Sequence, residues 1–175
     1  TKTSSDMSVK ELIKYIDDRI DGIESDMYGI ILKDISVVDI MYEYQPEYDR
    51  PEDILNDIIE FMPEDFKAPL TNEFTIKYMS PACEIEGVLA YYVTARIDDI
   101  SVNNIKINSS EVAEDTYTLY TTLAHEGYPG HLYQFTSFYG NEEVSNVRKA
   151  LDFIGATEGW AQYAAGQAID YLYKI

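Results

Sequence analysis

The stretch HEGYPGH at residues 125–131 decides how the second half of the chain folds, and it holds both histidines of the sequence. A neutral imidazole is a good zinc ligand, and a carboxylate beside it can accept a proton from zinc-bound water. The helical H-E-x-x-H motif of metallopeptidases combines the same residue types. His125 and His131 are therefore candidate metal ligands, and Glu126 is a candidate general base.

The spacing of the histidines differs from that motif, because six residues separate them rather than four. In a straight helix, six steps of roughly 100° leave the second side chain about 120° out of line. Pro129 lacks an N–H and its ring clashes with the preceding turn, while Gly130 tolerates irregular backbone. We expect a kinked active-site helix that brings His131 back toward His125. The local pattern equally allows a plain helix–helix turn that two histidines happen to flank.

A catalytic zinc site needs a third protein ligand, and Glu158 is the candidate. It lies 27 residues beyond His131, in an apolar stretch with helical character at residues 153–165. A carboxylate on such a stretch is either exposed or has a partner, because burying a bare charge is costly. The alternative is an exposed glutamate near a helix start, where the helix dipole favours it.

Two motifs in this order, HEGYPGHLYQ at 125–134 and EGWAQY at 158–163, resemble the signature of a large bacterial family of unknown function. That signature is H-E-x-x-P-G-H followed by E-G-W-A-x-Y, and the resemblance covers roughly residues 70–175. The family is grouped with the gluzincin metallopeptidases. The widened spacing is also similar to that of dipeptidyl peptidase III, whose H-E-x-x-x-H helix holds one extra residue.

The resemblance implies a Zn²⁺-dependent hydrolase that cleaves peptide bonds. His125, His131 and Glu158 carry over as metal ligands and Glu126 as the base. Asn108, Tyr128 and Tyr163 are expected at the substrate, the two tyrosines as candidate donors to the oxyanion. Ile105 to Asn108 is expected to form an edge strand that pairs with extended substrate. Asp115, Glu142 and Asp152 are available to orient the imidazoles, and nothing in the sequence selects among them.

The rest of the chain predicts an α+β fold, with a small β-sheet packed on helices and a glutamate-bearing helix after the kinked one. Ser8 and Glu11 form a capping box before an amphipathic helix, and Pro51 suits the first turn of a short helix. Strands are expected at residues 38–44, 74–78, 88–97 and 105–108, from alternation or β-branched and aromatic content. We expect an N-terminal helical and strand region at 1–70 and a gluzincin-like core at 71–175.

The composition excludes several classes of function. Thirty-two acidic residues against 13 basic ones give a formal net charge of −19, which argues against binding to nucleic acid or to an anionic membrane. The simpler interpretation of this charge is a solvated acidic surface. The alternative interpretation is that the charge attracts cationic substrates. No segment is apolar enough to span a membrane. The lone Cys83 excludes an intrachain disulfide and is typical of a small buried residue.

Two further expectations concern the whole protein. The helical pattern runs to Ile175 without a stop signal, and members of the resembling family extend well beyond the second motif, which indicates truncation. We therefore expect residues 1–175 to fold at least in part and to show little peptidase activity alone.

The resemblance also implies an extracytoplasmic or cell-surface location. The alternative function is a catalytically inactive binding or scaffold domain, and the oligomeric state stays open.

Overall fold

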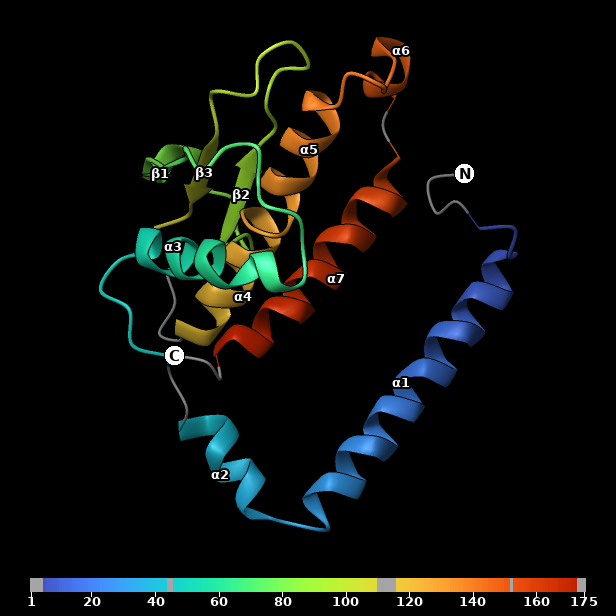
Figure 1. The fold of residues 1–175 in the computed structure, drawn as a ribbon. Coiled ribbons are helices and arrows are strands. Elements are labelled where there is room, and N and C mark those ends of the chain that lie inside the picture. Colours follow the sequence, from blue (N-terminus) through green and yellow to red (C-terminus); the bar gives the residue numbers. More distant parts are fainter. Residues whose placement is uncertain (1–4, 44–45, 110–115, 152, 173–175) are drawn as a thin grey trace. The chain divides into compact units, whose positions relative to one another are not determined.

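The computed structural model describes residues 5–43, 46–109, 116–151 and 153–172 (Figure 1). The chain divides into two compact units at residues 45/46. This boundary lies well before residue 70, so the helix that begins at Pro51 belongs to the second unit.

The first unit contains two helices, α1 (Val9–Ile31) and α2 (Ser36–Glu43). The capping box predicted for α1 is confirmed. The Glu11 N–H donates to the Ser8 hydroxyl at 3.3 Å, and the Ser8 N–H donates to the Glu11 carboxylate at 2.8 Å. These two bonds satisfy donors that a helix start otherwise leaves without partners, so α1 begins where the sequence predicts.

The strand predicted at residues 38–44 is wrong, because residues 36–43 form α2. The alternation of Val38, Ile40 and Tyr42 gave a local β signal that the structure does not follow. All strands among the described residues lie in the second unit. An isolated strand in the first unit would leave its N–H and C=O groups without partners, whereas a helix satisfies them internally.

The second unit contains a small mixed sheet of three strands in the order β1-β3-β2. Strand β1 (Thr75–Tyr78) runs parallel to β3 (Asn104–Ile107), and β2 (Ala90–Val93) runs antiparallel to β3. The strands predicted at residues 74–78, 88–97 and 105–108 are confirmed in position, although β2 is shorter than the stretch 88–97. The expectation that β3 is an edge strand is wrong, because both of its sides are paired. The cause is β2, which returns to pair with β3 and becomes the edge itself.

The second unit also contains several helices. They are α3 (Pro51–Phe61), α4 (Thr116–Glu126), α5 (His131–Gly140), α6 (Asn146–Lys149) and α7 (Ile154–Leu172), with short 3₁₀ turns at Met62–Glu64 and Pro81–Cys83. Pro51 occupies the first turn of α3 as predicted, and α5 ends at the predicted Gly140-Asn141 break.

The core of the second unit forms where these helices meet the sheet. Helix α4 packs against α3, α7 and β2, and α5 packs against α7 (Figure 1). Ile105 and Ile107 of β3 and Leu123 of α4 are fully buried in one apolar cluster. The buried Tyr120 hydroxyl of α4 donates to the carbonyl of Ala168 in α7 at 2.9 Å. The predicted α+β class, a small sheet packed on helices, is confirmed.

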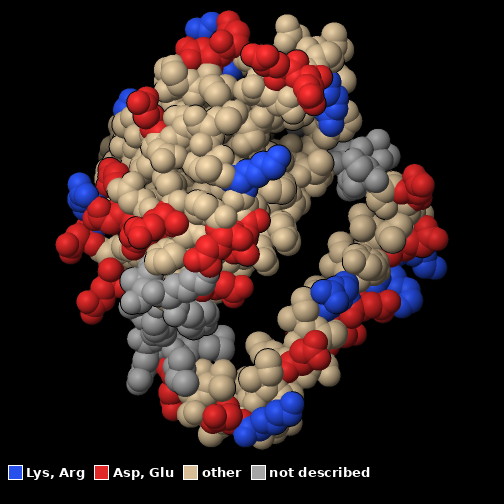
Figure 2. Space-filling view, in the orientation of Figure 1, with Lys and Arg blue, Asp and Glu red and all other residues tan. Residues whose placement is uncertain are grey.

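The surface carries acidic side chains at several places on both units (Figure 2). Cys83 is exposed, so the expectation that it is a buried apolar residue is wrong. It is the last residue of the short 3₁₀ turn Pro81–Cys83, which contains no buried residue. Within the described ranges, no helix combines the length and apolar character needed to cross a membrane.

Candidate metal centre

The break between α4 and α5 brings the two histidines together. Helix α4 ends at Glu126 and α5 begins at His131, with a cis peptide bond between Tyr128 and Pro129. The imidazole rings face each other edge to face, with their centroids 4.8 Å apart. The predicted return of His131 to His125 is confirmed, and the structure that produces it is a turn between two helices.

Gly130 permits this turn because the backbone passes extremely close to the end of α4. Its N–H donates to the carbonyl of Ala124 at 3.0 Å. A Cβ atom on Gly130 would lie 1.8 Å from the carbonyl oxygen of His125. Its φ of −77° is one that any residue adopts. Glycine is therefore required here because the backbone of another segment passes too close for a Cβ atom. The sequence pattern had indicated only that Gly130 tolerates irregular backbone.

Glu158 reaches both histidines from α7. Its Oε2 atom lies 3.5 Å from Nε2 of His125 and 3.5 Å from Nε2 of His131. No acidic residue lies in the first turn of α7, so Glu158 is beyond the part of the helix where the dipole would account for it. A distance of 3.5 Å is also long for a hydrogen bond between a nitrogen and a carboxylate oxygen. The carboxylate is thus aimed at the pair of imidazoles without closing a strong bond to either.

Trp160 fixes α7 against the histidine turn. Its indole N–H donates to the carbonyl of Pro129 at 2.9 Å, and its ring stacks on Tyr133 of α5 with centroids 6.2 Å apart. Because Trp160 is two residues from Glu158, this bond joins α7 to the turn close to the candidate ligand. We expect the tryptophan of the second motif to help position the glutamate of the same motif.

The three side chains together form a candidate metal site. One nitrogen from each histidine and one oxygen from Glu158 lie within 4.8 Å of one another. Ligands about 2.0–2.1 Å from a tetrahedral ion are separated by roughly 3.4 Å, close to the two histidine–glutamate distances. Two imidazoles and one carboxylate are also a ligand set that catalytic zinc sites use, with a fourth position left for water or substrate.

Glu126 sits beside this cluster and is anchored to the sheet. Its carboxylate accepts a hydrogen bond from the backbone N–H of Tyr92 at 2.8 Å. Tyr92 lies in the edge strand β2. Burial raises the pKa of the Glu126 carboxyl above its ordinary value, and the Tyr92 N–H and the two histidines oppose that effect. A carboxylate of raised pKa is a better proton acceptor than an exposed one.

A cavity of about 700 Å³ opens next to the cluster. Glu126, His131 and Glu158 line it together with Tyr91 and Tyr92 of the edge strand. Its size is within the range of roughly 300–1,000 Å³ that is usual for ligand pockets. Glu126, the candidate base, and two of the three candidate ligands therefore face one cavity of a size that a small ligand can enter.

The Nδ1 side of the His131 ring is buried. Its Nδ1 atom has no hydrogen-bond partner among the described residues. Histidine ligands usually donate from that nitrogen to a second group. Of the three carboxylates proposed for this task, Glu142 is exposed, and Asp115 and Asp152 lie outside the described residues.

The structure does not bring the three expected substrate residues to the cavity. Asn108 is fully buried and its side-chain amide donates to the carbonyl of Ile85 at 2.7 Å. Tyr128 is also fully buried, and its hydroxyl donates to the carbonyl of Thr71 at 2.7 Å. Tyr163 is 58% exposed on α7 and does not line the cavity. Asn108 and Tyr128 therefore lie in the interior and not on the lining of this cavity, and a role at the substrate stays a prediction.

Two features of the site escaped the sequence analysis. The Tyr92 N–H that holds Glu126 is a backbone group, and no residue type in the sequence marks it. The sequence does single out Trp160, because it is the only tryptophan of the chain and lies two residues after Glu158.

The chain matches the model of one protein family over residues 3–171, a longer stretch than the expected 70–175. That family is described as bacterial protein of unknown function (DUF885). No curated protein and no solved structure matches the chain. Because the family match covers both units and nearly all of the sequence, the chain belongs to this bacterial family, DUF885.

Proposed function

We propose that this chain contains the zinc-binding core of a metallopeptidase. The observation that carries the proposal is the convergence of His125, His131 and Glu158, with Glu126 lining the same cavity as His131 and Glu158. The resemblance of the two motifs to those of a family grouped with the gluzincin peptidases supports the same function.

Each of these residues would have a separate task. His125, His131 and Glu158 would hold the metal, which when bound supplies a Lewis acid and lowers the pKa of a coordinated water toward neutrality. Glu126 would accept a proton from the attacking water and deliver it to the leaving amine. The Tyr92 N–H keeps one oxygen of Glu126 engaged at 2.8 Å, which holds the other oxygen in a fixed direction.

The ligand assignment is tested by metal content. Protein purified without chelator is expected to contain about one zinc per chain, measured by atomic emission. His131→Ala and Glu158→Ala are each expected to lose tight zinc binding while staying folded by circular dichroism, because two ligands do not make a stable site. Glu60→Ala, which removes an exposed glutamate on α3, is the matched control and is expected to keep its zinc. Full zinc occupancy in either ligand variant contradicts the assignment.

The catalytic assignment is tested by Glu126→Gln in the natural protein. The amide oxygen of glutamine can still accept from the Tyr92 N–H, so the fold and the zinc content are expected to stay unchanged. The amide cannot accept the water proton, and hydrolysis of a mixed peptide library is expected to fall by about 10²–10⁴-fold. Normal turnover in the variant shows that Glu126 is structural. Zinc binding without hydrolysis in the unchanged protein favours the scaffold alternative.

A further inference from the structure

Arg148 lines the same cavity as Glu126, His131 and Glu158, although it comes from the short helix α6. Its guanidinium carbon lies 4.1 Å from the ring centroid of Phe153 and 5.5 Å from that of Phe138. Contacts of a guanidinium with two aromatic rings restrict its orientation without neutralising its charge. The cation is therefore held in place at the cavity.

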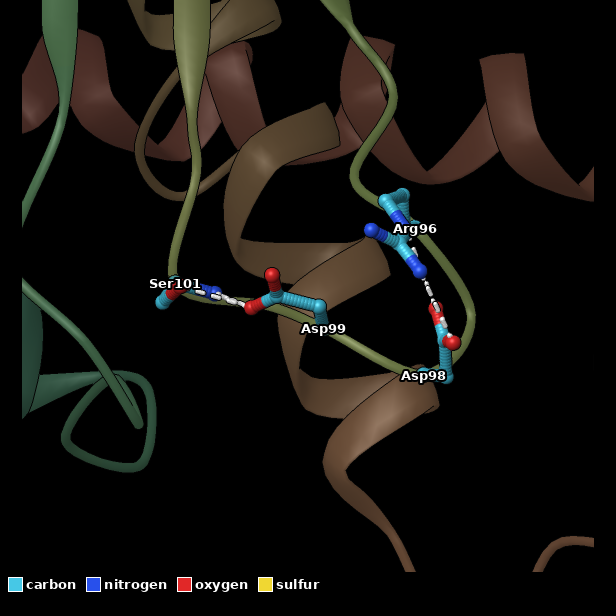
Figure 3. A network of polar contacts seen from close by, with 4 residues as sticks. All are labelled: Arg96, Asp98, Asp99 and Ser101. Carbon is cyan, nitrogen blue, oxygen red and sulfur yellow. Dashed lines mark hydrogen bonds and ion pairs between the residues drawn. The ribbon is translucent and has the colours of Figure 1, made fainter.

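Within the described part of the protein, no acidic side chain forms an ion pair with Arg148. The other two arginines of the second unit are paired, Arg50 with Asp53 at 2.6 Å and Arg96 with Asp98 at 3.0 Å. Figure 3 shows the Arg96 pair in the loop after β2, where both partners are nearly adjacent in sequence. Arg148 has no ion pair with any described carboxylate. In a chain with a net charge of −19, an arginine that lines a cavity and has no acidic partner among the described residues is unusual.

Lys149 adds a second positive charge to the lining of the cavity. Its ammonium group donates to the backbone carbonyl of Tyr139 near the end of α5. This bond ties α6 to the helix that carries His131, so the position of Arg148 is linked to that of the candidate metal centre. Glu126 and Glu158 line the same cavity, and the two adjacent cations favour an anionic group of the ligand next to themselves.

We propose that Arg148 binds a carboxylate of the peptide substrate and determines which peptides the cavity accepts. The carboxylate is either the C-terminal group of the peptide or an acidic side chain. The planar guanidinium can donate two parallel N–H bonds to a carboxylate, a geometry that a lysine cannot supply. The inference rests on the proposed peptidase function for the identity of the ligand, and it rests on Arg148, its two rings and the shared cavity for the site.

The test measures binding separately from hydrolysis. Calorimetry on zinc-loaded Glu126→Gln protein compares three forms of one neutral pentapeptide: a free C-terminal carboxylate, a C-terminal amide, and the amide with one internal glutamate. One of the two carboxylate forms is expected to bind about 10-fold more tightly than the neutral amide, because the contact is charge-assisted but partly solvated. The form that gains affinity identifies the source of the carboxylate. The gain is expected to shrink at high salt.

Variants at Arg148 test whether this residue causes the preference for a carboxylate. Arg148→Gln is expected to abolish the preference for the carboxylate form, and Arg148→Lys to retain part of it. Arg96→Gln is the matched control, because it removes an arginine that is paired outside the cavity, and it is expected to leave the preference unchanged. Equal binding of all three peptides, no binding at all, or a preference that survives Arg148→Gln overturns the inference.

The two proposals fail in different ways. If the protein hydrolyses peptides but shows no preference for a carboxylate, the role of Arg148 is wrong and the peptidase function stands. If the carboxylate preference depends on Arg148 but the protein neither retains zinc nor hydrolyses peptides, the anion site stands and the peptidase function is wrong.

Discussion

Replacing Gly130 with alanine is the sharpest test of how the turn builds the metal centre. The new Cβ atom would lie 1.8 Å from the carbonyl oxygen of His125 and 2.5 Å from that of Ala124. Both obstacles are backbone atoms, which cannot rotate away as a side chain can. The start of α5 and the end of α4 must therefore move apart.

The size of that movement follows from the contact distances. Real Cβ atoms essentially never approach a heavy atom closer than 3.0 Å, so the contact with His125 must open by more than 1 Å. Zinc–ligand distances tolerate only about ±0.2 Å. Because one side of the turn carries His125 and the other carries His131, the opening separates two of the three candidate ligands. We expect zinc affinity to fall at least about 100-fold and the free energy of unfolding of the metal-free protein to fall by about 1–3 kcal/mol.

The assay is a zinc titration against a competing chromophoric chelator, paired with urea unfolding of the metal-free protein. Gly159→Ala and Gly166→Ala are the matched controls on α7, because a Cβ at either position meets no atom within 4 Å. Each control is expected to keep its zinc affinity and to gain about 0.5–1 kcal/mol, since alanine favours a helix interior over glycine. Because Gly159 is next to Glu158, the Gly159→Ala variant also shows whether any added methyl group near the site weakens zinc binding.

The reasoning is refuted if Gly130→Ala binds zinc as tightly as the unchanged protein and unfolds at the same urea concentration. That result would mean that the turn relaxes without moving the histidines, and that close approach at Gly130 does not hold the site. Loss of zinc affinity in the Gly159→Ala control as well would mean that the assay reports general disturbance of the region.

Two further variants test the contacts that hold the helices around the site. Trp160→Phe keeps an aromatic ring beside Tyr133 but removes the donor to the Pro129 carbonyl. Zinc affinity is expected to weaken and the free energy of unfolding to fall by about 1 kcal/mol, and unchanged values in both titrations contradict the positioning role. Tyr120→Phe removes the buried bond from α4 to the Ala168 carbonyl in α7. It is expected to cost about 1–2 kcal/mol in urea unfolding with zinc stoichiometry unchanged, and no change in stability contradicts this account of the α4–α7 contact.

Local signals in the sequence predicted the elements whose causes are local. The Ser8 and Glu11 capping box fixes the start of α1 through bonds between residues three apart. Pro51 begins α3, and the Pro129-Gly130 pair separates α4 from α5. Each of these features depends on the backbone chemistry of a few neighbouring residues, so no knowledge of the rest of the fold is needed.

The features that the sequence did not predict depend on distant partners. Residues 38–44 alternate as a strand does, but a strand forms only where another strand can pair with it. β3 was expected at the edge, and pairing by β2 made it central. Asn108 and Tyr128 are polar residues near the motifs, and their hydrogen bonds to Ile85 and Thr71 place them in the interior instead of the cavity. The identity of a residue does not reveal which distant carbonyl it will meet.

By itself, the sequence determined the set of groups that could carry chemistry: two histidines around a proline–glycine break, a carboxylate beside the first, and Glu158 on a later helix. Only the tertiary structure decided that these groups meet. Helix α7 packs against α4 and α5, the Trp160 bond to Pro129 joins it to the turn, and Glu158 reaches both imidazoles at 3.5 Å. The bond from Lys149 to Tyr139 and the contacts of the guanidinium with Phe138 and Phe153 hold Arg148 at the cavity. The physical reason is that residue spacing fixes geometry only within one helix, whereas the placement of one helix against another follows from burial of apolar surface contributed by the whole unit.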